Sequence, residues 1–162
     1  MEPLHVAHLM AVGIWLGIVI TEALFEFSGS DAESLRAAAR FHYTVDMFGE
    51  LPVLAVVIIT GALLASRVGP LTPLHYVKIA ASLVAIGSNL ICAVWVVQRR
   101  RIVVERVLLA YRRKIWTTAA IGVIFGTAAL AIGLVYFRGC RWRIRSQAAT
   151  GISNRPLCSA KM

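Results

Sequence analysis

The segment FHYTVDMFGELPVLAVVIITGALLAS, residues 41–66, decides how the chain folds, because its apolar half alone is too short to cross a membrane. A helix that began at Pro52 and ended at Ser66 would reach only about 22 Å at ~1.5 Å per residue, whereas the hydrocarbon layer is ~30 Å thick. We therefore expect the helix to begin near Phe41. Pro52 then lies inside the helix as a kink, because proline removes one backbone hydrogen bond.

Three other apolar runs have the length of a membrane-spanning helix, and 59% of the 162 residues are hydrophobic. The fold class predicted is all-α, an integral membrane bundle of four transmembrane helices. The expected spans are residues 3–26, 41–66, 74–98 and 115–137. A basic, polar C-terminal tail is expected over residues 138–162.

The formal charge of +9 does not indicate a nucleic-acid partner in a chain of this kind. Basic loops of membrane proteins are topology signals and contacts to anionic lipid head groups. No basic segment precedes the first apolar run, so we expect the first helix to be retained as a span rather than cleaved as a signal peptide. The expected location is a bacterial inner membrane, where the chain is a multi-pass protein in contact with lipids.

The polar residues of the spans divide into two groups, because consecutive helices of the bundle cross the membrane in opposite directions. One end of the bundle is expected to hold His5, His8, His75 and Lys78, and the other Glu22, His42, Asp46 and Glu50. The last three are spaced by four residues and form one slanting stripe on a helix. His8 and Glu22 are separated by about 21 Å of helical rise, so two separate sites are predicted.

The first group suits a haem site. Imidazole is an axial ligand of haem iron and also binds copper, and the Lys78 ammonium could pair with a haem propionate. The cofactor expected here is haem b, with His8 as the main ligand and His5 or His75 as a second. The alternative is that His5 lies in the membrane interface and that Lys78 extends to the head groups.

The second group suits a copper, zinc or iron ion, or a proton relay, because it combines one nitrogen ligand with several carboxylates. The alternative places His42 and Asp46 in the head-group layer, with the acids paired to Arg36, Arg40 or the basic segment 99–114. Glu50 lies deeper and fits that alternative less well.

Other residue types are given structural roles. Gly13 with Gly17, and Gly122 with Gly126, form GxxxG pairs and are predicted to be helix contacts. The three cysteines contain no CxxC pair, so neither a disulfide framework nor a zinc site is predicted from them.

The segment LHVAHLMAVGIWLG, residues 4–17, resembles the opening helix of the copper-resistance D (CopD) family and of HemJ-type protoporphyrinogen oxidases. The segments ITGALLASR (59–67) and YVKIAASLVAIGSN (76–89) resemble later parts of the same fold. The resemblance implies a compact bundle in which His8 and Lys78 match the haem-associated histidine and lysine. Glu22 stands where HemJ-type proteins carry arginine, and Asn89 where they tend to carry histidine, which favours the metal-handling side of the resemblance.

Three classes of function follow from these patterns. The first is a haem- or transition-metal-binding membrane protein, an oxidoreductase if haem is bound, with an electron-transfer partner. The second is a permease for copper or another metal ion. The third is a noncatalytic subunit of a larger membrane complex, whose basic loop and tail bind other membrane subunits.

Overall fold

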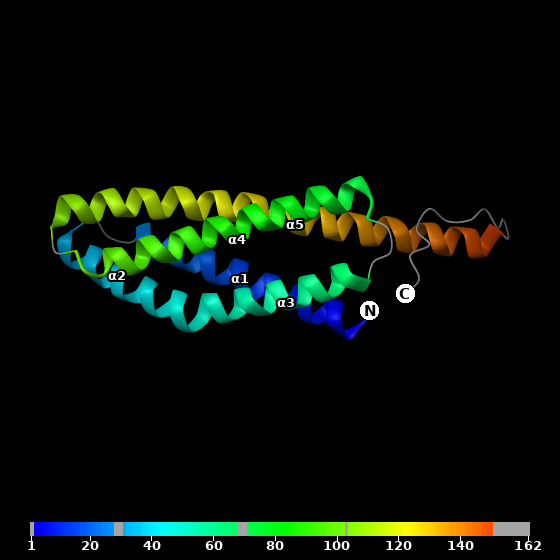
Figure 1. Cartoon of the computed structure of the whole chain (residues 1–162), viewed down its shortest axis with the longest axis horizontal. Coiled ribbons are helices and arrows are strands. Elements are labelled where there is room, and N and C mark those ends of the chain that lie inside the picture. The colour runs from blue at the N-terminus through cyan, green and yellow to red at the C-terminus, as the bar shows by residue number, and fades with distance from the viewer. Residues whose placement is uncertain (1, 28–30, 68–70, 103, 151–162) are drawn as a thin grey trace.

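A computed structural model of the chain describes residues 2–27, 31–67, 71–102 and 104–150, which contain helices and no strand. Figure 1 shows the helices side by side, with consecutive spans running in opposite directions. The elements are α1 (Pro3–Phe27), α2 (Ala32–Val45), η1 (Asp46–Glu50), α3 (Leu51–Arg67), α4 (Pro73–Arg99) and α5 (Glu105–Thr150).

Four helical segments are long and apolar enough to cross a membrane, which confirms the predicted all-α bundle of four transmembrane helices. They are Pro3–Glu26, Glu33–Arg67, Pro73–Arg99 and Glu105–Val135.

Two helices begin earlier than their sequence suggested. The second starts at Ala32 rather than near Phe41, and α5 starts at Glu105 rather than at residue 115. α5 also continues through Thr150, so residues 138–150 extend the last helix, which projects beyond the others in Figure 1. The added stretches are charged, but Arg, Lys, Leu and Glu are good helix formers and no proline interrupts them. Residues 151–162 of the expected tail, and residues 68–70 of the connector before α4, lie outside the described residues.

The expected kink at Pro52 takes the form of a π-helical turn, η1. The Leu51 N–H donates to the carbonyl of Asp46, five residues back rather than four. Pro52 has no N–H and its ring crowds the carbonyl of Phe48, so a wider turn just before it relieves the clash. Asp46 and Glu50 thereby face the interior, at 1% and 4% exposed, while Phe48 between them is 79% exposed.

Helix caps fix where two spans begin. At the start of α2, Asp31 Oδ2 accepts a hydrogen bond from the Ser34 N–H at 3.1 Å, and the Ser34 hydroxyl also donates to the Asp31 carboxylate. The hydrogen bond from the Ser34 hydroxyl, and after it the one from the Ser34 N–H, hold the pKa of Asp31 below its ordinary value. At the start of α4, the Thr72 N–H donates to His75 Nδ1 at 3.3 Å, which places His75 in a cap.

The helices associate as two pairs, α1 with α3 and α4 with α5. The pairs meet along α1 and α5 and, at one end, where α2 packs on α4. Trp15, Val19, Leu54 and Ala85 form a small core where the pairs meet. Trp15 can lie there only because Gly126 has no side chain, since a Cβ at this position would come within 2.7 Å of the indole ring.

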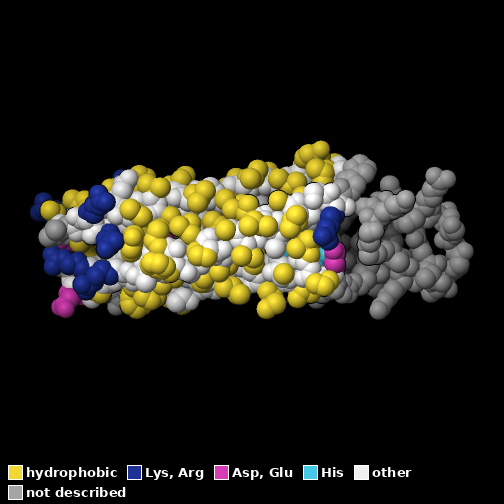
Figure 2. Space-filling model, turned by 60° about the horizontal axis from the view of Figure 1, so that its bottom comes forward, with side chains coloured by type: hydrophobic (Ala, Val, Ile, Leu, Met, Phe, Trp, Pro, Cys, Tyr) yellow, Lys and Arg dark blue, Asp and Glu magenta, His cyan; other side chains and the backbone are white. Residues whose placement is uncertain are grey.

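The outer surface is apolar along most of its length, and basic side chains gather at one end (Figure 2). The exposed basic residues of the end formed by α2 and the α4–α5 connection are Arg36, Arg40, Arg100, Arg101, Arg106, Arg113 and Lys114. At the opposite end Glu2 pairs with Arg67. An apolar band between two charged ends is the surface expected of a chain that lies in lipid.

The two GxxxG pairs differ in whether their glycines contact a neighbouring helix. A Cβ at Gly122 would meet Ala85 and Ser88 at 3.7 Å, so Gly122 and Gly126 are helix contacts as predicted. A Cβ at Gly13 or Gly17 would meet nothing within 4 Å, so the prediction for that pair is wrong within this chain.

We expect Gly126→Ala to lower the stability of the bundle by about 1–3 kcal/mol, because the new methyl group overlaps the buried Trp15 ring. The thermal midpoint of the detergent-purified protein measures this loss. Gly87→Ala is the matched control, because its Cβ meets nothing within 4 Å, and it should leave the midpoint unchanged or raise it. Equal midpoints for the two variants would contradict the packing described for Trp15.

Candidate functional site

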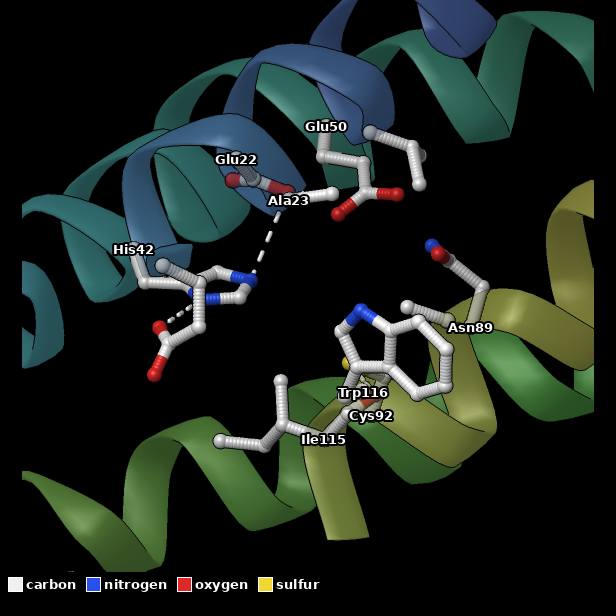
Figure 3. Close-up of a pocket in the computed structure, with 11 residues that line it drawn as sticks. Glu22, Ala23, His42, Glu50, Asn89, Cys92, Ile115 and Trp116 are labelled. Atoms are coloured by element: carbon white, nitrogen blue, oxygen red, sulfur yellow. Dashed lines mark hydrogen bonds and ion pairs between the residues drawn. The ribbon is translucent and has the colours of Figure 1, made fainter. Parts of the chain in front are cut away.

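A cluster of buried polar side chains lies between α1, η1 and the ends of α2 and α4 (Figure 3). Its acidic members are 1–4% exposed and its histidine is 5% exposed. They are Glu22 and Glu26 of α1, His42 of α2, and Asp46 and Glu50 of η1. The structure thus brings together all four residues of the predicted second group and adds Glu26.

His42 is the centre of this cluster. Its Nε2 lies 3.4 Å from Glu22 Oε2 and 3.8 Å from Asp46 Oδ1. Its other ring nitrogen, Nδ1, lies 3.6 Å from Glu26 Oε2. One imidazole therefore faces two carboxylates on one side and a third on the other, and both His42 and Asp46 are buried inside the bundle.

Glu26 is held by an ion pair from the other half of the bundle. Arg99, 1% exposed, places its Nη1 2.6 Å from Glu26 Oε1 and donates from Nη2 to the Leu35 carbonyl at 3.3 Å. Arg112 Nε also lies 4.0 Å from Glu26 Oε1. Glu26 thus pairs with the basic segment 99–114, whereas the acids of the predicted second group do not, and α1, α2 and α4 are tied together at a point with almost no solvent.

Glu50 has a separate partner. Trp15 donates from Nε1 to Glu50 Oε1 at 2.9 Å, and both side chains are buried. Since Trp15 is the middle residue of α1, Glu50 lies at mid-depth in the bundle. Its partner is a neutral donor rather than a base.

The cluster has an excess of negative charge. Both arginines near it contact Glu26, whereas Glu22 and Asp46 have only His42 as an ion-pair partner among the described residues. Burying carboxylates is costly unless positive charge accompanies them. A bound cation, or protons on these groups, is needed to balance the cluster.

The spacing of the polar atoms suits a metal ion. One ligand atom each from Glu22, His42 and Asp46 lie within 4.8 Å of one another. Ligands at ~2.0–2.2 Å from a tetrahedral ion lie about 3.3–3.6 Å apart, and His42 Nε2 lies 3.4 Å from Glu22 Oε2 and 3.8 Å from Asp46 Oδ1. Glu22, His42 and Glu50 also border a cavity of about 20 Å³, enough for a water molecule or one ion and far too small for a porphyrin.

The residues of the first group lie at the opposite end of the bundle. His8 Nδ1 lies 2.8 Å from the Thr60 hydroxyl, and its ring packs on Gly61, where a Cβ would come within 3.2 Å. Lys78 is close enough to His8 for their charges to interact, in agreement with the predicted shared end. His5 pairs with Glu2 at 3.4 Å, so two of the predicted residues serve local contacts, His5 in this pair and His75 in the α4 cap.

Several site residues were not identified from the sequence. In the sequence Arg99 belongs to a basic segment, Glu26 lies at the end of an apolar run, and Cys92 has no second cysteine nearby. The i,i+4 spacing of Glu22 and Glu26 was an available signal for Glu26. Cys92 and Asn89 come from α4, and no local pattern relates them to α1 or α2.

No family model, curated protein or solved structure matches the chain.

We expect Arg99→Gln to lower the stability of the protein by about 3–5 kcal/mol, because it leaves the Glu26 carboxylate buried without its main partner. Thermal unfolding in detergent measures the effect. Arg113→Gln is the control, since Arg113 is exposed, and it should change stability by less than about 0.5 kcal/mol.

A double-mutant cycle separates the ion pair from general damage. Glu26→Gln combined with Arg99→Gln should cost less than the sum of the single changes, because the double variant leaves no unpaired charge. Strict additivity would show that the two side chains do not interact.

Proposed function

We propose that this chain is a membrane protein that binds a transition-metal ion through Glu22, His42 and Asp46 and serves in metal handling. The observation that carries the proposal is the set of three buried ligand atoms within 4.8 Å of one another. A nitrogen ligand combined with carboxylate oxygens suits zinc, copper or iron, and a divalent ion would offset the excess negative charge of the cluster.

The surroundings of His42 support the proposal. Histidines that bind a metal through one ring nitrogen usually direct the other at a carboxylate, which orients the ring. Here Glu26 lies at Nδ1 while Glu22 and Asp46 lie at Nε2, and Arg99 fixes Glu26 in turn. This is the arrangement expected of a metal ligand and its outer partners.

A bacterial inner membrane is the proposed location, in keeping with the apolar surface. The resemblance of residues 4–17 to the CopD family adds copper to the ions to be tested. That resemblance stays a prediction.

The full chain, purified in detergent, loaded with zinc, copper or iron and then dialysed, should retain one ion per chain by elemental analysis. His42→Ala should weaken binding by more than the roughly 10–100-fold that loss of an outer partner costs, because a direct ligand is removed. His8→Ala is the matched control, since His8 lies at the other end of the bundle, and it should bind as the unchanged chain does. Absence of any stoichiometric ion in the unchanged chain would overturn the proposal.

Haem binding at the opposite end is a second candidate, favoured by one observation. His8 Nδ1 is engaged by Thr60, so Nε2 is the ring nitrogen that would ligate the iron, and Lys78 lies near His8 as a partner for a propionate. If haem b binds there, the protein purified from haem-supplied cells shows a Soret band. Haem would supply redox chemistry, and His8 would hold its iron.

We expect His8→Ala to abolish that Soret band and His42→Ala to preserve it, because only His8 would ligate the iron. Absorption spectra of the two purified variants make the comparison. A colourless unchanged protein excludes the haem candidate and leaves the metal proposal untouched.

A further inference from the structure

We infer that Cys92 is the fourth ligand of the ion, which makes the site one for zinc and similar thiol-binding divalent ions rather than for magnesium or calcium. The inference rests on the proposed function and adds to it a ligand and a selectivity. It starts from the position of Cys92, a buried residue of α4 that is 6% exposed.

Cys92 borders the same 20 Å³ cavity as Glu22 and His42. Cys92 lies close enough to His42 for the two side chains to interact, and the hydrogen bond that its thiol makes is weak, a donation to the Ile115 carbonyl at 3.9 Å. In Figure 3, Cys92 and Ile115 stand across the opening from Glu22 and His42. The sulfur is therefore on the wall that faces Glu22 and His42. Asp46 does not border the cavity, and the three ligand atoms that lie within 4.8 Å of one another do not include Cys92 Sγ, so these side chains would have to move closer together around a bound ion.

Two further polar atoms border the same cavity without a partner. Glu22 Oε1 and Asn89 Nδ2 are buried and have no hydrogen-bond partner among the described residues. Buried polar atoms in this condition are rare and call for an explanation, such as an ion or water that the protein was built to hold. Cys92 is thus part of a polar pocket and does not stand alone.

The four residues form a donor set typical of zinc. One sulfur, one imidazole nitrogen and two carboxylate oxygens can surround a tetrahedral zinc ion, with bonds of ~2.3 Å to sulfur and ~2.0–2.2 Å to the others. Magnesium and calcium prefer oxygen ligands alone. As the sulfur–metal bond forms, the thiol releases its proton to the buffer, and the ion stays divalent because no electron is transferred.

The ion would also join the two helix pairs. Glu22, His42 and Asp46 belong to the pair that contains α1 and the α2–α3 helix, whereas Cys92 belongs to α4. A ligand that binds only the folded bundle raises its apparent stability. Zinc should therefore raise the thermal midpoint of the unchanged chain, and this rise should be smaller in Cys92→Ser.

Cobalt gives the decisive test, because a thiolate bound to Co²⁺ produces a sulfur-to-metal charge-transfer band in the near ultraviolet. The full chain with Cys140→Ser and Cys158→Ser, purified in detergent and loaded with Co²⁺, should show this band, since Cys92 is then its only cysteine. Adding Cys92→Ser should remove the band and weaken Zn²⁺ binding by more than the roughly 10–100-fold that loss of an outer partner costs. Excess Mg²⁺ should displace neither ion.

Ser88→Ala is the matched control, because Ser88 lies one turn earlier on α4, is buried and does not border the cavity. It should keep both the band and the Zn²⁺ affinity. The thermal midpoint of Cys92→Ser without metal shows whether this variant still folds. Cys92→Ala provides a second variant that lacks the thiol. Co²⁺ bound without the band, with equal Zn²⁺ affinity in Cys92→Ser, overturns the inference and leaves the proposed function standing. Failure of the unchanged chain to bind either ion overturns both.

Discussion

The missing amide hydrogen of Pro52 is the constraint on which the rest of the site depends. The proline lies inside a helix that must continue to cross the membrane, so the chain widens the preceding turn rather than ending the helix. That π-turn directs both Asp46 and Glu50 inward and leaves Phe48 on the lipid side. Without it, a regular helix would carry the stripe of acids steadily around its surface.

Once carboxylates face the interior, their charge determines how the two helix pairs can meet. Arg99 reaches from the end of α4 to Glu26 on α1, so one buried ion pair closes the basic end of the bundle. Trp15 reaches Glu50 at mid-depth and needs the space left by Gly126 on α5. The two contacts lie at different heights, and between them Glu22, His42 and Asp46 have no arginine partner among the described residues. The candidate metal site therefore lies where the buried acids have no arginine partner, because the nearby arginines pair with Glu26.

The sequence predicted the four spans, because the length and hydrophobicity of one continuous segment are enough to decide whether it can cross a bilayer as a helix. It also grouped Glu22 with His42, Asp46 and Glu50, since antiparallel crossing fixes which helix ends are neighbours. The helix that begins at Glu105 was not predicted, because charged residues also favour loops and here their helix propensity prevailed. Arg99 and Cys92 were missed for a different reason: which face of α4 meets α1 is set by packing between distant segments, and no spacing in the sequence encodes it.

The cluster differs from an ordinary buried ion-pair network in the balance of its charges. In such a network each acid is matched by a base, because breaking a buried pair leaves an uncompensated charge at a cost of about 3–5 kcal/mol. Glu26 meets this condition through Arg99, and Glu50 is satisfied in part by the indole of Trp15. Glu22 and Asp46 share one imidazole, whose two nitrogens already face three carboxylates. Replacing either acid with an apolar residue would be expected to stabilise the bundle, so these two acids are the part of the cluster that the proposed cation would account for.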